Sequence, residues 1–373
     1  MSLRLGAVSC ALATLLLCAC GSAPPRATPT PVQPEASPTR TLAPLATPRP
    51  TSEPLSVALP TPTRPARVTP TIARLATPQA APSPTAAAVG GVEPIAVMVD
   101  NIAEARPQSG LGTADVVYEA PAEGGIPRLM PIYFHAGPGR VGPVRSARHY
   151  FVYLAAEYGA ALVHVGASPQ GFQALSETGL VNVDEIEGAA GFSRDPRRAP
   201  PHNAYINLPT LRDALIRQGT DPDGTLGGLH FGLDAAPAGG QPASTLEIDF
   251  PGGARYVCQY AYDPASRTYP RSMDGSPHRD AETGERYAAR AVIVERVAAP
   301  AIPGDDAGRL DVEVTGSGDG LLALDGQAYP ITWARSDVTH PTSYAYANGA
   351  PVVLPQGQVW IELAPRDANV VTR

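Results

Sequence analysis

Short apolar runs separated by turn residues fill the chain from about residue 94 onward. In the first half, runs at 95–99, 116–119, 129–134 and 161–165 read as strands. Three stretches between them have helical spacing. They run from Ser146 to Tyr158, from the Ser168-Pro169 cap to Gly179, and from Asn207 to Gly219. A glycine ends each of them: Gly159 after the first, and Gly179 and Gly219 in the other two.

Beyond a Gly/Pro-rich hinge at 235–243 the helical period disappears. Runs at 245–250, 254–262, 291–297, 310–315, 320–324, 329–333 and 358–363 are short, alternating or β-branched, with Gly, Asp and Pro between them. The pattern predicts an α+β protein. We expect a mixed α/β domain over 93–238 and a smaller β-rich domain over 243–366.

The first 20 residues have the pattern of a bacterial lipoprotein signal peptide. Arg4 gives the positive start, residues 5–17 the apolar run, and Leu17-Cys18-Ala19-Cys20 the cleavage motif. The run is too short to cross about 30 Å of hydrocarbon comfortably. We therefore predict lipid modification at Cys20 and a cell-membrane anchor with the body on the extracytoplasmic face.

Residues 21–92 have the composition of a linker. Residues 21–90 contain 17 prolines among Thr, Ala and Ser, with almost no large apolar clusters. Such a segment buries too little apolar surface to offset about 1 to 2 kcal/mol of backbone entropy per ordered residue. The composition predicts a disordered Pro/Thr/Ala-rich tether.

Charge separates the linker from the body. All 28 basic residues are arginines, and residues 91–373 carry 21 of them against 33 acidic residues, a formal charge of −12. An acidic body argues against nucleic acid and anionic lipid headgroups as main partners, so the N-terminal lipid is the expected membrane contact. Of four cysteines, Cys258 alone lies in the body, within a strand-like run that favours a buried apolar role.

The densest chemistry lies around residues 142–148. Ser146 is expected to cap a helix whose first amides are unpaired, and Arg145 and Arg148 flank the same turn, an arrangement that suits an anion. Arg106, Arg128 and Arg194 are further candidates. The alternative is that Arg145 and Arg148 form ion pairs with carboxylates of the body, Glu119 and Glu123 being the obvious partners.

Oxygen-rich positions supply a second set of candidates. Asp100 and Asn101 end a strand, and Asp115 precedes Glu119 and Glu123, a type of cluster that can hold a divalent ion bridging to phosphate. The spacing matches no metal-binding loop, and strand-end Asp and Asn commonly form turns, so we predict no metal and no cofactor. His202 and Asn203 lie in a proline-rich loop that suits either a structural or a catalytic imidazole.

Several strings together resemble one known family. They are MVDN at 98–101, ARPQSGL at 105–111, ADVVYE at 114–119, EGGI at 123–126, GPVRSAR at 142–148 and PHN at 201–203, with GSG at 316–318 and GQVWI at 357–361 in the second half. In their combination and order they resemble the YerB-like lipoproteins, domain of unknown function 3048. The resemblance spans nearly all of 94–365 and implies no established reaction.

Two functional interpretations remain open. The first is a non-catalytic envelope lipoprotein that binds an anionic ligand, such as a cell-wall polymer, through Arg145, Ser146, Arg148 and neighbouring Arg106, Asn101, Glu123 and Asn203. The second is an enzyme of envelope polymers, of the phosphoryl or glycosyl-phosphate transferase type, with the arginines as clamp and Asp100, Glu119 or His202 as catalytic candidates.

Overall fold

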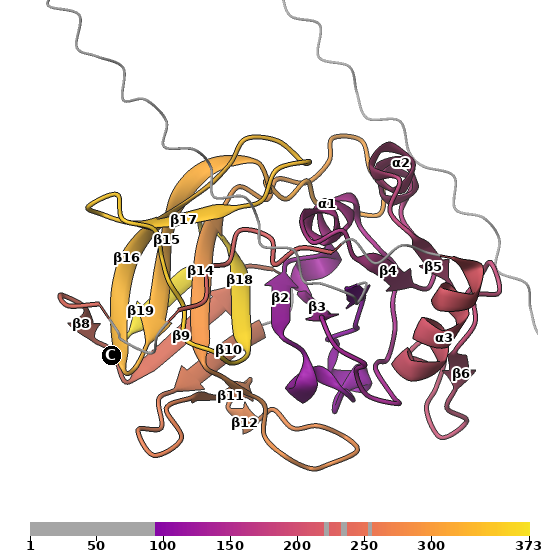
Figure 1. Cartoon of the computed structure of the whole chain (residues 1–373), viewed down its shortest axis with the longest axis horizontal. Coiled ribbons are helices and arrows are strands. Elements are labelled where there is room, and N and C mark those ends of the chain that lie inside the picture. The colour runs from indigo at the N-terminus through magenta and orange to yellow at the C-terminus, as the bar shows by residue number, and fades with distance from the viewer. Residues whose placement is uncertain (1–93, 220–223, 233–236, 253–255) are drawn as a thin grey trace, which may run out of the picture. The chain divides into compact units, whose positions relative to one another are not determined.

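A computed structural model describes residues 94–219, 224–232, 237–252 and 256–373 of the chain (Figure 1). The described residues form one compact unit. The predicted signal peptide with Cys20 and the predicted linker 21–92 lie outside the described residues. Strands and a few helices build the described part, so the predicted α+β class is confirmed.

The largest sheet has eleven strands, in the order β17-β16-β15-β14-β18-β2-β3-β1-β4-β5 with β8 paired to β16. The bounds are β1 (Ile95–Val97), β2 (Val116–Ala120), β3 (Arg128–Tyr133), β4 (Ala161–His164), β5 (Asn182–Asp184), β8 (Gln241–Pro242), β14 (Ala291–Val297), β15 (Gly316–Leu324), β16 (Gln327–Arg335), β17 (Ser343–Tyr346) and β18 (Val359–Pro365).

Strand β18 joins the two halves of the chain. It runs parallel to β14 on one side and parallel to β2 on the other, where Val359 pairs with Val116 and Glu362 with Glu119. All seven residues of β18 are buried, as expected for a parallel strand covered on both faces. The large sheet takes strands from both predicted domains. The residue boundaries of these two domains stay a prediction.

A second sheet of six strands has the order β12-β11-β10-β9-β19, with β13 paired to β11. Its strands are β9 (Thr245–Phe250), β10 (Tyr256–Ala261), β11 (Tyr269–Met273), β12 (Ser276–Pro277), β13 (Ala288–Ala289) and β19 (Asn369–Thr372). β6 (Phe192–Arg194) and β7 (Ala204–Ile206) form a separate two-stranded sheet.

The helices are α1 (His149–Glu157), α2 (Pro169–Thr178) and α3 (Leu208–Gln218), with 3-10 turns at Ala103–Ala105, Leu111–Thr113 and Glu123–Gly125. The predicted ends of α2 and α3 are confirmed. The Ser168 side chain accepts from Gly171 N at 3.0 Å, that of Asn207 accepts from Thr210 N at 2.9 Å, and Gly179 and Gly219 end the helices in the left-handed conformation.

The predicted start of α1 at Ser146 is wrong. Arg148 occupies the N-cap position and no side chain caps the helix. Ala147 forms a parallel bridge with Ala167, and its amide donates to Gly166 O at 3.0 Å. The segment before Arg148 therefore stays extended against the sheet, and the helix begins only after it.

The predicted strand at 310–315 is also absent from the described structure. Asp311 N donates to Pro300 O and Glu313 N to Ala298 O, and Ala301 and Leu310 form an isolated bridge. Pro300 and Pro303 have no amide hydrogen to donate, which prevents a regular ladder on the partner segment.

Apolar side chains form two cores, one on each face of the large sheet. Ala96 and Met98 join α1 and α2 in the first core, whereas Ile95, Val97 and Val99 join α3 and the second sheet in the other. This strict alternation explains why β1 is buried on both faces. Figure 1 shows α1 and α2 side by side over the sheet.

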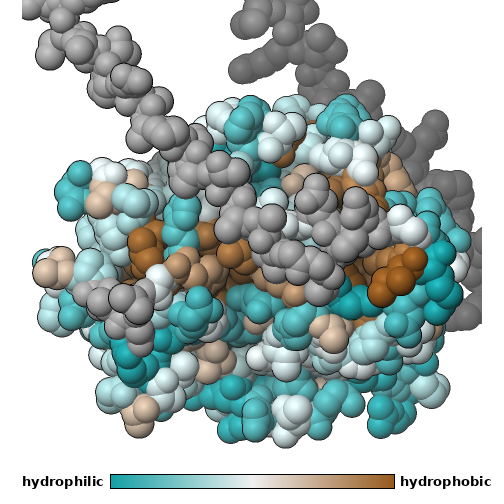
Figure 2. Space-filling model, in the orientation of Figure 1, coloured by the Kyte–Doolittle hydropathy of each residue, from teal (hydrophilic) through white to brown (hydrophobic). Residues whose placement is uncertain are grey.

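Polar side chains dominate the outer surface. The face in Figure 2 is mostly hydrophilic, with a hydrophobic band across its upper middle. Among the described residues the exposed large apolar side chains are Phe172, Ile186, Ile216 and Val353. No helix in the described part of the chain has the length and apolar character needed to span a bilayer.

Candidate functional site

The segment 144–147 crosses the carboxyl ends of β1 and β4. Arg145 N donates to Met98 O at 2.9 Å, and Arg145 O accepts from Val165 N at 3.1 Å. Because Ala147 also pairs with Ala167, the starts of α1 and α2 lie next to each other. The carboxyl ends of parallel strands and the starts of helices are the usual place for ligands in sheets covered by helices.

Asp100 contacts two basic side chains at this edge. Its Oδ2 lies 3.0 Å from Arg145 Nε and 2.6 Å from His202 Nδ1, although His202 is 102 residues away in the chain. Asp100 is buried, while the side chains of Arg145 and His202 are 27% and 18% exposed. The acid is therefore held inside and the two basic groups reach the surface.

Arg145 keeps part of its donor capacity free. Its Nε lies 3.0 Å from Asp100 Oδ2 in an ion pair but forms no hydrogen bond, and neither Nη1 nor Nη2 hydrogen-bonds to a residue that the structure describes. The neighbouring Ser146 hydroxyl is likewise without a hydrogen-bond partner within that part of the chain, and Ser146 is half-buried. A guanidinium held through Nε by an ion pair can present its two terminal nitrogens as a fork that matches a carboxylate or phosphate.

Arg148 forms an ion pair with Glu123, as the alternative interpretation of the sequence predicted. It contacts Glu123 through Nε and donates from Nη1 to Ala147 O at 2.8 Å. Arg128 pairs with the same carboxylate at 3.2 Å and donates to Ser146 O. Burial acts to raise the pKa of Glu123, but the Arg148 hydrogen bond and the charges of both arginines outweigh it and lower that pKa. The pKa of Arg128 falls to about 10, chiefly through burial.

Two other predicted ligand-binding residues bond to the protein itself. Arg106 donates from Nε and Nη2 to Asn101 O and from Nη1 to Asp274 Oδ2 at 2.7 Å. Asn203 is buried, and its Oδ1 accepts from Arg194 at 3.0 Å. Neither side chain forms a hydrogen bond or ion pair with the Asp100–Arg145–His202 group, so the structure does not bring them into it.

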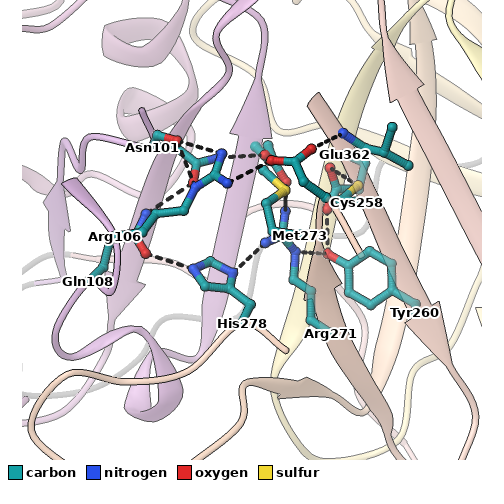
Figure 3. A network of polar contacts seen from close by, with 12 residues as sticks. Asn101, Arg106, Gln108, Cys258, Tyr260, Arg271, Met273, His278 and Glu362 are labelled. Carbon is teal, nitrogen blue, oxygen red and sulfur yellow. Dashed lines mark hydrogen bonds and ion pairs between the residues drawn. The ribbon is translucent and has the colours of Figure 1, made fainter. Parts of the chain in front are cut away.

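Asn101 and Glu119 lie inside the protein, and Figure 3 shows Asn101 within the polar network around Arg271. Asn101 Nδ2 donates to Glu119 Oε1 at 2.9 Å, and both side chains are fully buried. Gln108 Nε2 donates to Asp100 O at 2.9 Å and to Asn101 Oδ1 at 3.0 Å. Glu119 is thus out of reach of solvent and of Arg145, but hydrogen bonds connect it to the backbone that carries Asp100.

Arg271 of β11 is the centre of this buried network. It contacts Glu119 through Nη2, Tyr260 Oη through Nε at 3.0 Å and His278 Nδ1 through Nη1. Since a guanidinium only donates, His278 Nδ1 must accept and its Nε2–H donates to Gln108 Oε1 at 2.7 Å. Burial and the nearby charges of Arg271 and Arg106 lower the pKa of His278, which keeps this imidazole neutral.

Glu362 completes the network from β18, the strand that pairs with β2 and its Glu119. Tyr260 Oη donates to its Oε1, and Cys258 Sγ lies 3.9 Å from its Oε2. Burial, followed by the charge of Glu119, raises the pKa of Glu362 well above its usual range. The pair of carboxyl groups therefore holds one proton and one negative charge, which Arg271 balances.

Metal-ligating atoms come together at one place in the described residues. Glu119, Cys258 and Glu362 bring one ligand atom each within 4.8 Å of one another, and all three are buried. Arg271 already neutralises Glu119, and burial raises the pKa of the Cys258 thiol well above its usual range. A protonated acid, a protonated thiol and an adjacent guanidinium do not fit a cation.

Sequence reasoning missed the arginine at the centre of the network. Tyr269, Arg271 and Met273 are the buried positions of alternating strand β11. An arginine in phase with inward-facing Tyr and Met is a signal of a buried charge, and it was available in the sequence. Its partner Glu119 is 152 residues away, which no local pattern indicates.

The fold and the network describe an α+β body built around one shared sheet, and comparison with known proteins identifies its family. Residues 82–221 match the family described as "Protein of unknown function (DUF3048) N-terminal domain", and residues 246–361 match the corresponding C-terminal domain. The chain therefore belongs to the YerB-like family, as its motifs predicted.

A relative from Bacillus subtilis (strain 168), named "Putative lipoprotein YerB", is 33% identical over 277 residues, which cover 73% of this chain and 81% of that protein. The crystal structure of the YerB protein from Bacillus subtilis superposes with a TM-score of 0.67 at 29% identity, over 76% of this chain and 95% of the other.

Proposed function

We propose that this chain is a membrane-anchored, extracytoplasmic lipoprotein whose body binds an anionic cell-envelope ligand at Arg145. The lipoprotein part of the proposal is supported by the cleavage motif before Cys20 and by the name of the relative. The extracytoplasmic location follows from the export signal. The envelope ligand follows from that location combined with the basic edge of an otherwise acidic body.

The single observation that carries ligand binding is the state of the Arg145 guanidinium. Nε forms an ion pair with Asp100 at 3.0 Å, and none of the three guanidinium nitrogens forms a hydrogen bond with a described residue. Most other arginines of the predicted site are used internally, Arg148 and Arg128 by Glu123 and Arg106 by Asp274. A guanidinium that is oriented but incompletely paired is preorganised for an oxyanion.

The local charge balance supports the same conclusion. Arg128, Arg145 and Arg148 face the carboxylates of Asp100 and Glu123, so the cluster keeps one net positive charge before His202 is counted. The adjacent starts of α1 and α2 add positive helix-dipole ends. The ligand we propose is a phosphate- or carboxylate-bearing wall polymer.

The test measures binding of anionic wall-polymer fragments and of inorganic phosphate to the purified full-length chain by calorimetry. We expect Arg145→Gln to weaken binding about tenfold or more, as loss of a charged hydrogen bond does. Arg366→Gln is the matched control, because Arg366 forms an exposed ion pair with Glu313 elsewhere. Equal affinity of the Arg145→Gln variant and the unmodified chain would refute the proposal.

A second candidate function, an envelope-polymer enzyme of the phosphoryl or glycosyl-phosphate transferase type, is favoured by the Asp100–His202 pair. A carboxylate at 2.6 Å from Nδ1 favours the tautomer with the proton there, which leaves Nε2 as a proton acceptor. The test is turnover of phosphodiester and glycosyl-phosphate substrates. Loss of turnover in His202→Gln with binding retained supports the enzyme, and unchanged turnover removes His202 from it.

A further inference from the structure

Residues 105–110 form a bridging segment that the C-terminal half of the chain holds in place. Gln108 O accepts from Ala281 N at 2.8 Å, and Gly110 N donates to Asp280 Oδ2 at 2.7 Å. Both partners come from the match to the C-terminal family domain, whereas the bridging segment belongs to the N-terminal one. The position of this segment therefore depends on residues far from it in the sequence.

The bridging segment also contacts the backbone that carries Asp100 and the loop that carries His202. Gln108 Nε2 donates to Asp100 O at 2.9 Å. Arg198, which lies four residues before His202 in the same loop, donates from Nη1 to Ala105 O at 2.9 Å. Two separate hydrogen bonds thus connect the segment to the two partners of the 2.6 Å contact between Asp100 and His202.

His278 connects this segment to the C-terminal half through a side chain. Figure 3 shows its ring between Gln108 and Arg271. Nε2–H donates to Gln108 Oε1 at 2.7 Å, and Nδ1 accepts from Arg271 Nη1. The imidazole is buried and packs edge-on against Tyr287, with the ring centres 4.8 Å apart. Bonds at both nitrogens and a packed ring leave His278 one orientation.

The direction of each hydrogen bond follows from the groups involved. Asn101 Nδ2 donates to the Glu119 carboxylate, so Asn101 Oδ1 is left to accept. Gln108 Nε2 donates to this oxygen and to a backbone carbonyl, so its Oε1 is the atom that faces His278. The side-chain bonds close into a ring in which each donor meets an acceptor. Its members are Asn101, Gln108, Glu119, Arg271 and His278.

The orientation of the Gln108 amide depends on the donor that His278 supplies. Gln108 is fully buried, so its Oε1 would have no partner without the His278 N–H. An amide in that state lowers its free energy by turning or moving toward another donor. The same movement takes Nε2 away from Asp100 O, to which it is bonded at 2.9 Å.

We infer that His278 is a positioning residue for the Asp100–Arg145–His202 group. Acting through Gln108, it holds Asp100 where its carboxylate meets both Arg145 and His202. The arrangement of the site in the N-terminal half is therefore completed by a side chain of the C-terminal half. The inference rests on the proposed function, because it takes this group as the place where an anion binds.

Two substitutions at His278 separate a positioning role from a structural one. The amide of asparagine comes near the place of Nδ1 and can still accept from Arg271, but it does not reach Gln108. The amide of glutamine comes near the place of Nε2 and can still donate to Gln108. Each variant loses one bond of the same buried ring, so their stability losses, measured by urea unfolding, should be similar.

The first measurement records ¹⁵N spectra of the full-length chain labelled at its histidines, with the His202 signals assigned by their loss in His202→Gln. We expect His278→Asn to move the imidazole signals of His202, because its contact with Asp100 changes. His278→Gln should keep them in place. The signals of His149, which pairs with Asp311 elsewhere, are the internal control and should stay unchanged in both variants.

The second measurement is calorimetric titration with inorganic phosphate. We expect His278→Asn to weaken phosphate binding about tenfold, as loss of a group that orients a binding residue does, and His278→Gln to retain it. If the unmodified chain binds no phosphate, the proposed function fails for this probe. The His202 spectra then still decide whether His278 positions the group.

Arg198→Gln provides a variant that keeps the buried ring intact, since Arg198 is partly exposed. It removes the contact of the His202 loop with Ala105 and should also move the His202 signals. The inference is overturned if His278→Asn leaves these signals in place, or if His278→Asn and His278→Gln move them equally. Should neither His278 variant fold, unchanged His202 signals in Arg198→Gln would overturn it.

Discussion

Glu119 of β2 and Glu362 of β18 are register partners on adjacent parallel strands, fully buried and neutralised together by Arg271. Arg271 comes from the second sheet, so one guanidinium connects both sheets and both halves of the chain. Because burial and the charge of Glu119 raise the pKa of Glu362, the two acids carry a single negative charge between them.

Because Glu119 and Glu362 share one negative charge, the stability losses caused by replacing each of them should not add up to the loss in the double variant. Glu362→Gln replaces a protonated acid by a neutral side chain of similar shape and should cost about 1 kcal/mol or less. In Glu119→Gln the charge can move to Glu362, so we expect about 1 to 3 kcal/mol. The double substitution leaves Arg271 buried without a carboxylate and should cost about 3 to 5 kcal/mol. Denaturant unfolding of the cycle measures the coupling, and simple additivity would contradict a shared charge.

Glu295 predicts a pH dependence of stability. Burial, and then the charge of Glu157, raises its pKa from 4.5 to about 7, against a hydrogen bond from Tyr344 that lowers it. Between these two values the folded state binds more protons than the unfolded state. The free energy of unfolding should therefore fall as pH rises through this window, by about 3 kcal/mol in total, and level off above it.

Chemical denaturation across that range checks the dependence. Glu295→Gln should remove this part of the slope, because it has no proton to lose. Glu104→Gln, at an exposed position, is the control and should keep the slope. A Glu295→Gln variant with the same slope as the unmodified chain would show that another group causes it.

Arg145 and Arg148 should differ in their effect on folding. Arg148 is buried and pairs with Glu123, so Arg148→Gln should cost about 1 to 3 kcal/mol. Arg145 is partly exposed and uses one nitrogen, so Arg145→Gln should cost at most about 1 kcal/mol. Urea unfolding of both variants tests this order. A loss of several kcal/mol in Arg145→Gln would make Arg145 a structural ion-pair residue and remove the basis of the anion site.

The anchoring prediction concerns a residue outside the described part of the chain. Cys20 has the residues Leu17, Cys18 and Ala19 before it that a lipoprotein cleavage site requires. We expect Cys20→Ala to abolish incorporation of labelled fatty acid in cells, with Cys258→Ala as the control that retains it. Label still incorporated into the Cys20→Ala chain would exclude this lipidation site.

Local signals predicted the helix ends that depend on local bonds. Ser168 and Asn207 cap α2 and α3 with their own side chains, and Gly179 and Gly219 end these helices. The start of α1 was misplaced because the bridge from Ala147 to Ala167 determines it. A contact between segments 20 residues apart leaves no mark on the sequence pattern around Ser146.

The sequence predicted the residues of the candidate site, but it predicted only part of the contacts among them. Asp100, Arg145 and His202 were all candidates, but their meeting depends on the order of strands and on the loop that returns His202 to β1. Glu119 was expected near the same surface. The alternation of β2 allows either face for it, and the second sheet with Arg271 decided that it is buried.

Periodicity, caps, composition and motifs are local properties of the chain, so the sequence alone was enough for the class of elements, the acidic charge of the body and the family, and it predicts a secretion signal. The tertiary structure decided which charges pair, since β18 inserts beside β2 and brings Glu362 to Glu119 from 243 positions away. Ion pairs across a sheet depend on strand order and register, and these are set by the packing of the whole core rather than by neighbouring residues.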